Sequence, residues 1–164
     1  MSITAERLRD LAHYDPETGV MRWRVNRDRA GNAKAGDALG HPDKDGHLRA
    51  KVDGRSYYIH RLAFLYMNGD WPAAQIDHRD CNPANNAWEN LRPATQSENQ
   101  RNQSVAKNNQ LGVKGVRRFR DKYRAAITVN GKTQHLGTYA TAEVAHAVYR
   151  RAVRAQHGEF GRAE

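Results

Sequence analysis

Residues 76–91 read IDHRDCNPANNAWENL, which joins an Asp-His pair to a polar stretch with four asparagines. Hydrolysis of a phosphodiester needs a base that activates water and a cation that neutralises the charge developing on the phosphate. A histidine, with an ordinary pKa of about 6.5, can accept that proton at neutral pH. Asp and Asn oxygens suit Mg²⁺, and an amide carbonyl can accept the second imidazole N–H and fix the tautomer. The segment therefore holds the residue types for metal-assisted phosphodiester hydrolysis.

The elements around this segment should bring these groups together. IDH at 76–78 is strand-like, 79–88 is a polar loop, and NLRPAT at 90–95 can form a second strand. Asp77 and His78 are successive strand residues, whose side chains point to opposite faces. They can therefore share a site only near the end of the strand or beside a bend.

A helix should follow the second strand. Thr95 and Glu98 have the spacing of a capping box, in which each side chain bonds the backbone N–H of the other residue. Asn99 and Asn102 would then lie one turn apart on the same helix face. The predicted order is strand, loop, strand, helix.

The stretch DHRDCNPANNAWENLRPATQSENQRN resembles the HNH nuclease family in its H-N-N form, and the flanking GRSYYIHRLAFLYMNGDWP is similar to phage HNH homing endonucleases. The resemblance implies a ββα-metal fold in which His78 is the general base and Asn90 orients it. It also implies that Asp77 and Asn99 hold one Mg²⁺ or Mn²⁺ ion, with Asn102 as the rival for the second ligand position.

Other polar residues near this site have plainer roles. Asn82, Asn85 and Asn86 are expected to form turns, with a phosphate contact as the alternative. His60 is expected to be a structural residue at the start of a helix. Cys81 stands where relatives often have Gly, and its role stays open.

The first 70 residues should pack the nuclease core. Asp53-Gly54 lies between the strand-like runs 47–52 and 55–60, a pattern typical of a two-residue hairpin turn. Residues 60–68 are apolar nearly all round and are followed by Gly69, which predicts a buried helix that ends there.

Charge separates the two ends of the chain. The formal net charge is +9, and residues 1–102 hold 15 Lys and Arg against 14 Asp and Glu. Residues 103–164 hold 12 against 4. A basic block of this kind suits a polyanion, although a solvated basic surface is the alternative from charge alone.

The basic block has its own pattern. GVKGVR, KYRAAI, HLGTY and TAEVAHAVY resemble the APETALA2-type DNA-binding domain, a three-stranded antiparallel sheet backed by one helix. Asn130-Gly131 predicts the turn between the last two strands, and Thr141 predicts the start of the helix. The tryptophans usual in that sheet are absent, so no sequence preference carries over. The resemblance, with the adjoining turn, implies these DNA-contacting residues: Lys114, Gly115, Arg117, Arg118, Arg120, Lys122, Arg124, Thr128, Thr133 and His135.

We therefore predict an α+β protein with three parts: an HNH nuclease domain over 1–103, a linker over 104–112 and an APETALA2-type domain over 113–164. Within the first part, 1–70 forms the hairpin and helix and 71–103 the ββα-metal core. The single cysteine excludes an internal disulfide, and no apolar run could span a bilayer. The expected setting is cytoplasmic, in a bacterial host if a phage encodes the protein. We expect a monomer with no protein partner.

The predicted function is metal-dependent hydrolysis of double-stranded DNA, most simply by nicking. One rival is a DNA-binding regulator whose nuclease module is silent. Another is a nuclease that acts on RNA.

Overall fold

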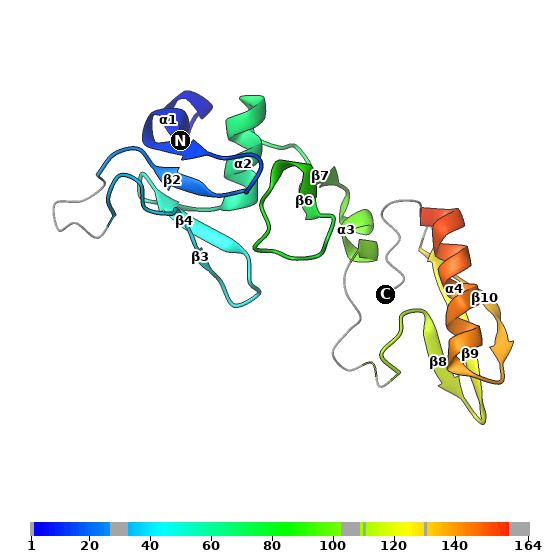
Figure 1. Ribbon diagram of the computed structural model, residues 1–164. Coiled ribbons are helices and arrows are strands. Elements are labelled where there is room, and N and C mark those ends of the chain that lie inside the picture. The colour runs from blue at the N-terminus through cyan, green and yellow to red at the C-terminus, as the bar shows by residue number, and fades with distance from the viewer. Residues whose placement is uncertain (1, 27–32, 103–108, 110, 130, 158–164) are drawn as a thin grey trace. The chain divides into compact units, whose positions relative to one another are not determined.

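The computed structural model describes residues 2–26, 33–102, 109, 111–129 and 131–157 (Figure 1). These residues form two compact units, Met1–Gln96 and Ser97–Glu164. The prediction of a chain that mixes helices and strands is confirmed. Most of the predicted linker and residue 130 of the predicted Asn-Gly turn lie outside the described residues. No helix in the described part is long and apolar enough to cross a bilayer.

The first unit begins with a capped helix and a short hairpin. In α1 (Ala5–Leu11), the Thr4 hydroxyl accepts the Arg7 N–H at 3.2 Å and so caps the helix. Strand β1 (Ala12–Tyr14) then pairs antiparallel with β2 (Met21–Trp23). Alternate residues of both strands are buried, so the hairpin turns one face towards the core.

A second sheet follows, formed by β3 (His41–Pro42), β4 (Leu48–Val52) and β5 (Arg55–Tyr58) in that order. The predicted turn is confirmed: Asp53 and Gly54 both have positive φ, 46° and 82°, between β4 and β5. Both residues therefore adopt the left-handed conformation that a tight hairpin turn requires.

Helix α2 (Ile59–Asn68) leads directly out of β5 and lies beside the sheets (Figure 1). Ile59, Leu62 and Leu65 are almost fully buried in the core that also holds residues of α1, β1, β2 and β4. The helix ends at Gly69, whose φ of 86° gives the left-handed C-cap that the sequence predicted.

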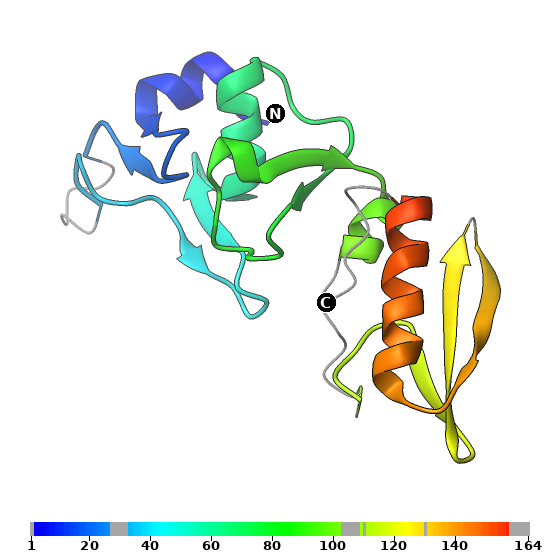
Figure 2. The same cartoon turned by 45° about the vertical axis from the view of Figure 1, so that its right-hand side comes forward.

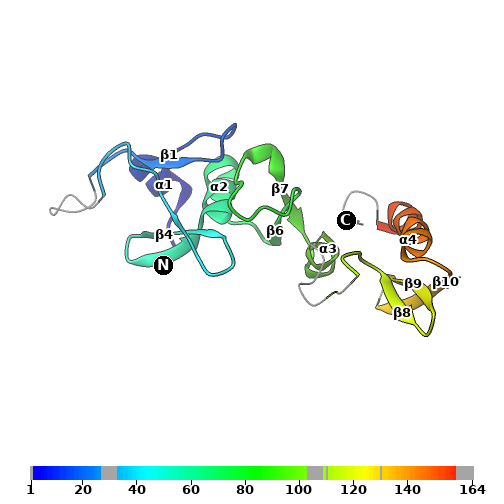
Figure 3. The same ribbon diagram turned by 60° about the horizontal axis from the view of Figure 1, so that its bottom comes forward.

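Two further strands carry the Asp-His pair. Strand β6 (Gln75–His78) pairs antiparallel with β7 (Leu91–Ala94), so that Asp77 lies opposite Arg92 and His78 opposite Leu91 (Figure 3). A 3₁₀ turn, η1 (Trp88–Asn90), precedes β7, and helix α3 (Gln96–Asn102) follows it. The second strand begins one residue later than predicted because Asn90 donates its N–H back to the Ala87 carbonyl at 2.9 Å.

In the second unit, β8 (Val116–Phe119), β9 (Lys122–Val129) and β10 (Lys132–Tyr139) form an antiparallel sheet with β9 in the centre. Helix α4 (Ala142–His157) runs along this sheet and contacts all three strands (Figure 2). Val116, Ala125 and Ala145 form the small core between sheet and helix. The opposite face of the sheet is therefore left for the outward residues of each strand.

One core residue of the first unit is titratable. His60, in the first turn of α2, is 8% exposed. Burial lowers its pKa to about 3, and neighbouring His78, His47 and Arg61 act in the same direction while Asp43 opposes them. His60 is thus neutral in the folded protein at any pH near neutrality.

This burial predicts a pH dependence of stability. In the unfolded chain His60 has a pKa of about 6.5, so below that pH the unfolded state binds a proton that the folded state does not. The stability that depends on neutral His60 is fully present above pH 6.5, and it is lost as the pH falls towards about 3. The slope is at most about 1.4 kcal/mol per pH unit.

Denaturant unfolding of the wild type and of His60→Phe between pH 7.5 and 4 tests this. The difference in unfolding free energy between the two proteins should move in favour of the phenylalanine variant as the pH falls. Parallel curves would contradict the assignment. Val52→Ala, which removes no titratable group from β4, is the control, and its curve should run parallel to that of the wild type.

Candidate active site

His78 ends strand β6 and is only 6% exposed. Its Nε2 lies 3.2 Å from Oδ1 of Asn86. The amide of Asn86 is oriented by a second bond, because its Nδ2 donates to the Ala84 carbonyl at 3.0 Å. A carbonyl only accepts, so the NH₂ group of Asn86 must face Ala84 and its oxygen must face the imidazole.

This arrangement selects one tautomer of His78. Nε2 has to carry the proton that it donates to Asn86, and the lone pair of the neutral ring then lies on Nδ1. Burial lowers the pKa of His78, and nearby His47 acts in the same direction, whereas the Asn86 bond and the carboxylates of Asp80 and Asp77 oppose this. The ring is therefore held as a neutral base at neutral pH.

The loop that presents Asn86 is anchored to the N-terminal hairpin. Asn86 is 1% exposed, and its carbonyl accepts the hydroxyl of Tyr14 at 2.7 Å. Trp88 donates its N–H to the Pro16 carbonyl at 2.8 Å. Gly19 has φ +72°, and a Cβ there would lie 2.2 Å from the Ala87 nitrogen. The turn between β1 and β2 thus packs directly against the backbone of the loop, and only glycine fits at that point.

Asn90, predicted to orient His78, has other partners. Its Oδ1 accepts the N–H of Asp80 at 3.0 Å, and its Nδ2 donates to Asp80 Oδ1 at 2.9 Å and to the Asn85 carbonyl at 2.8 Å. In the structure the amide at the His78 ring is that of Asn86, which the sequence had assigned to turn formation. Asn90 instead closes the loop on itself.

Asp80 is the centre of this closure. Burial alone would raise the pKa of Asp80, but the bonds from the Asn82 N–H and from the Asn85 and Asn90 amides outweigh it and lower the pKa. The loop also contains Cys81, whose φ of 60° is unusual for a residue other than glycine. Cys81 therefore adopts the left-handed conformation that glycine adopts most readily.

Asp77, the predicted metal ligand, is buried at 4% exposure and bonded to its cross-strand neighbour Arg92. Arg92 donates from Nε and Nη2 to Asp77 Oδ2 at 2.9 and 2.8 Å. The ring of His78 lies instead among other rings and Asn86, as expected for consecutive residues of one strand. In the part of the chain that the structure describes, no group of three His, Cys, Asp or Glu side chains is placed to hold a metal ion.

Two histidines that the sequence did not assign to the site lie beside the base. The ring centres of His60 and His47 are 5.2 Å and 5.8 Å from that of His78. His60 was expected to be purely structural, and nothing in the spacing of the sequence marked His47, which lies between β3 and β4. Asn99 belongs to α3, in the second unit.

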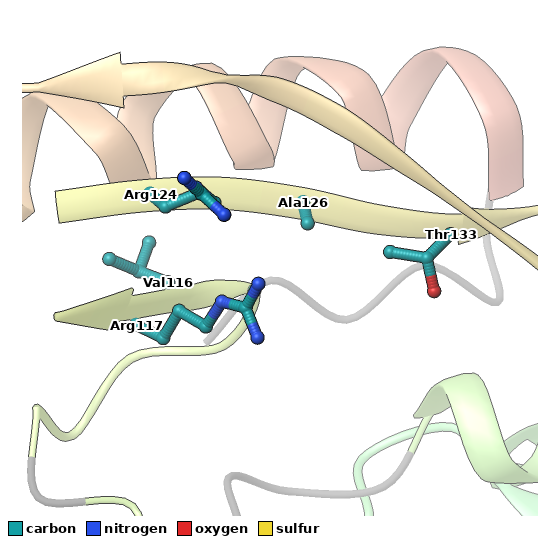
Figure 4. A pocket seen from close by; sticks show the side chains of 6 residues that line it. Val116, Arg117, Arg124, Ala126 and Thr133 are labelled. Atoms are coloured by element: carbon teal, nitrogen blue, oxygen red, sulfur yellow. The ribbon is translucent and has the colours of Figure 1, made fainter. Parts of the chain in front are cut away.

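Two cross-strand pairs of predicted DNA-contacting residues lie on the outer face of the sheet in the second unit. Arg117 pairs with Arg124 across β8 and β9, and Thr128 pairs with Thr133 across β9 and β10. A hollow of about 210 Å³ lies on this face (Figure 4). Its lining residues are Gly115, Val116, Arg117, Arg124, Ala126 and Thr133.

Arg124 is held in place on this face. Its guanidinium carbon lies 3.6 Å from the ring centre of Phe119, a half-exposed side chain at the end of β8. A cation over an aromatic ring at this distance is stabilised by the ring quadrupole. The contact limits the freedom of the guanidinium while leaving it at the surface.

Two predicted contacts lie elsewhere. A Cβ on Gly115 would lie 2.0 Å from the ring of Tyr149, so this glycine allows β8 to approach α4 closely. Arg118 pairs with Tyr123 and therefore shares the sheet face that packs on α4 rather than the outer face. The other predicted residues are Lys114, which precedes β8, Arg120 and Lys122 in or beside the turn, and His135, exposed on β10.

Three comparisons relate the chain to known proteins. Residues 57–101, which include α2, the Asp-His strand and the Asn loop, match a family model described as HNH endonuclease. Protein 3.8 of Escherichia phage T7 is 38% identical to the chain over 98 residues, which cover 58% of this chain and 80% of that protein. A solved structure of the HNH homing endonuclease I-HmuI aligns with 89% of this chain and 84% of its own at 22% identity and a TM-score of 0.41.

The phage relative is matched over most of its length, and the family model covers both strands around His78. The chain belongs to the HNH endonuclease family.

Proposed function

We propose that this protein is a metal-dependent DNA endonuclease in which His78 is the general base. The observation that carries the proposal is the bond from His78 Nε2 to Asn86, with an Nε2···Oδ1 distance of 3.2 Å. This bond supports a neutral His78 ring that is protonated at Nε2 and can accept a proton at Nδ1. The HNH endonuclease family to which the chain belongs provides the reaction class.

In the proposed reaction, His78 Nδ1 takes a proton from a water molecule whose oxygen attacks the scissile phosphorus. The bond from phosphorus to the 3′ oxygen breaks, and that oxygen leaves and is protonated. The products are a 5′-phosphate and a 3′-hydroxyl. Asn86 holds the ring in the productive tautomer, and Asn90 with Asp80 keeps the loop closed around it.

A divalent ion, Mg²⁺ or Mn²⁺, would neutralise the charge that develops on the phosphate. Asp77 and Asn99 would hold it, and both offer the oxygen donors that Mg²⁺ prefers. Asp77 also accepts two bonds from Arg92, both at Oδ2. The assignment of Asp77 and Asn99 to the ion rests on their places in the sequence pattern.

The same proposal assigns the parts of the chain. Residues 71–103 would be the ββα-metal core, within a nuclease domain over 1–103. The antiparallel pair β6 and β7, followed by α3, supports it. Residues 104–112 would be a linker and 113–164 an APETALA2-type DNA-binding domain, supported by the three-stranded sheet with α4 along one side.

The outer face of that sheet would bind the DNA backbone or bases. Arg117 and Arg124 are in register on adjacent strands, beside the hollow seen in Figure 4. The strong excess of positive charge after residue 102 supports a polyanionic ligand. Arginine contacts phosphates and guanine equally well, so the proposal includes no target sequence.

The setting proposed is a phage-infected bacterial cell, because the T7 relative is a phage protein. The protein would act as a monomer, most simply nicking one strand. A homing role rests on the sequence resemblance. The rivals are a DNA-binding regulator with a silent nuclease module and a nuclease for RNA. The His78–Asn86 geometry favours an active enzyme over the regulator.

Nicking of a supercoiled plasmid tests the proposed chemistry. Wild-type protein should nick with Mg²⁺ and not with EDTA, and His78→Ala should reduce the rate about 10²- to 10⁴-fold, the usual contribution of a general base. His13→Ala, at an exposed position on β1, is the matched control and should nick normally. Activity without a divalent ion, or unchanged activity in His78→Ala, would refute the assignment.

The DNA-binding face has a separate test. Arg117→Ala and Arg124→Ala should each weaken binding to duplex DNA and reduce the slope of log affinity against log salt by about 1. Arg151→Ala and Arg154→Ala remove the same charge from exposed positions of α4 and serve as controls. If the sheet variants and the helix variants lose the same affinity for DNA, binding depends on total charge and not on this face of the sheet. Stronger binding to duplex RNA than to duplex DNA would favour the RNA nuclease.

A further inference from the structure

Four aromatic side chains from separate parts of the first unit meet in one cluster, and one of them is the proposed base. They come from the turn before β4, the end of β5, the start of α2 and the end of β6. Each ring centre lies between 5.2 and 5.8 Å from at least two of the others. We call this set, His47, Tyr58, His60 and His78, the ring cluster.

His60 is buried, and its ring contacts each of the other three rings. It stacks on Tyr58 with an interplanar angle of 12° and meets His47 at 65°. It meets His78 edge to face, at 90° and 5.2 Å between ring centres. A perpendicular arrangement at this distance is one of the favoured geometries for two aromatic rings, with the edge of one against the face of the other.

The contact of His60 with His78 is one of packing. Nδ1 of His60 is fully buried and has no hydrogen-bond partner among the residues that the structure describes. A hydrogen-bonding role in the folded protein would need a partner there. The imidazole therefore acts on its neighbour through its shape and its position.

His60 is itself held firmly. It lies between Ile59 and Leu62, which are 1% and 0% exposed in the core. His60 stacks on Tyr58, and Arg49 of β4 lies over the Tyr58 ring with its guanidinium carbon 4.8 Å from the ring centre. The stack is thus built on the first turn of a helix and on paired strands, which are rigid supports.

We propose that His60 is a positioning residue that keeps the ring of His78 in its productive orientation. The hydrogen bond from Nε2 to Asn86 holds that end of the ring. The His60 ring, set perpendicular to the His78 ring with 5.2 Å between their centres, limits tilting of the ring plane. The two contacts together therefore define both the position and the plane of the base.

Burial also makes His60 suitable for this place. Because its pKa is lowered to about 3, the residue brings no positive charge next to His78 at neutral pH. A phenylalanine would offer the same shape and neutrality. An alanine would leave a space beside the base that water could enter.

The inference rests on the proposed role of His78 and is tested by comparing His60→Phe with His60→Ala. Val52→Ala truncates a side chain that is fully buried on β4 of the same unit and controls for lost stability. The measurements are the single-turnover nicking rate on saturating DNA, per folded molecule, and the affinity for DNA. His60→Ala should nick about 10- to 100-fold more slowly with unchanged affinity. His60→Phe and Val52→Ala should both nick within about threefold of the wild-type rate.

Equal losses in His60→Phe and His60→Ala would overturn the inference, because the imidazole nitrogen itself would then be needed. An equal loss in Val52→Ala, or none in His60→Ala, would also overturn it. Relaxation of the His78 ring carbons in solution separates this question from the proposed function. Even if the wild type failed to nick, the His78 ring should be less ordered in His60→Ala than in His60→Phe, and equal order would refute the inference.

Discussion

The hydrogen bond between the amide of Asn86 and the imidazole of His78 is the contact on which the rest of the site depends. Both residues are buried, and the bond joins the end of β6 to the loop that follows it. Much of the first unit contributes to it. The Tyr14 hydroxyl and Gly19 hold the backbone of the loop, and α2 brings His60 to the other side of the ring. The fold around β6 therefore fixes the position of one neutral imidazole ring.

The sequence predicted correctly those features whose conformation is set by residues adjacent in the chain. Asp53-Gly54 forms its turn because both residues accept positive φ, and α2 ends at Gly69 for the same reason. Strand β6 ends at His78 as expected.

The contacts within the site could not be predicted from the spacing of residues in the sequence. Asn86 and Asn90 are both amides in one loop, and only the anchoring of residues 86–88 by Tyr14 and Pro16 decides which faces the histidine. His47 and His60 reach His78 through the tertiary packing of β4, β5 and α2. The pairing of Asp77 with Arg92 depends on strand register. Each of these contacts joins residues distant in the chain, where local propensity says nothing.

The central claim is that Asn86 holds His78 as a neutral ring protonated at Nε2. Nitrogen-15 NMR of the histidine rings, at a pH between 7 and 8, reports this directly, since protonated and unprotonated ring nitrogens have widely different shifts. The account predicts that His78 shows a protonated Nε2 and an unprotonated Nδ1. A His78 ring protonated at Nδ1, or one that averages between both tautomers, would contradict it.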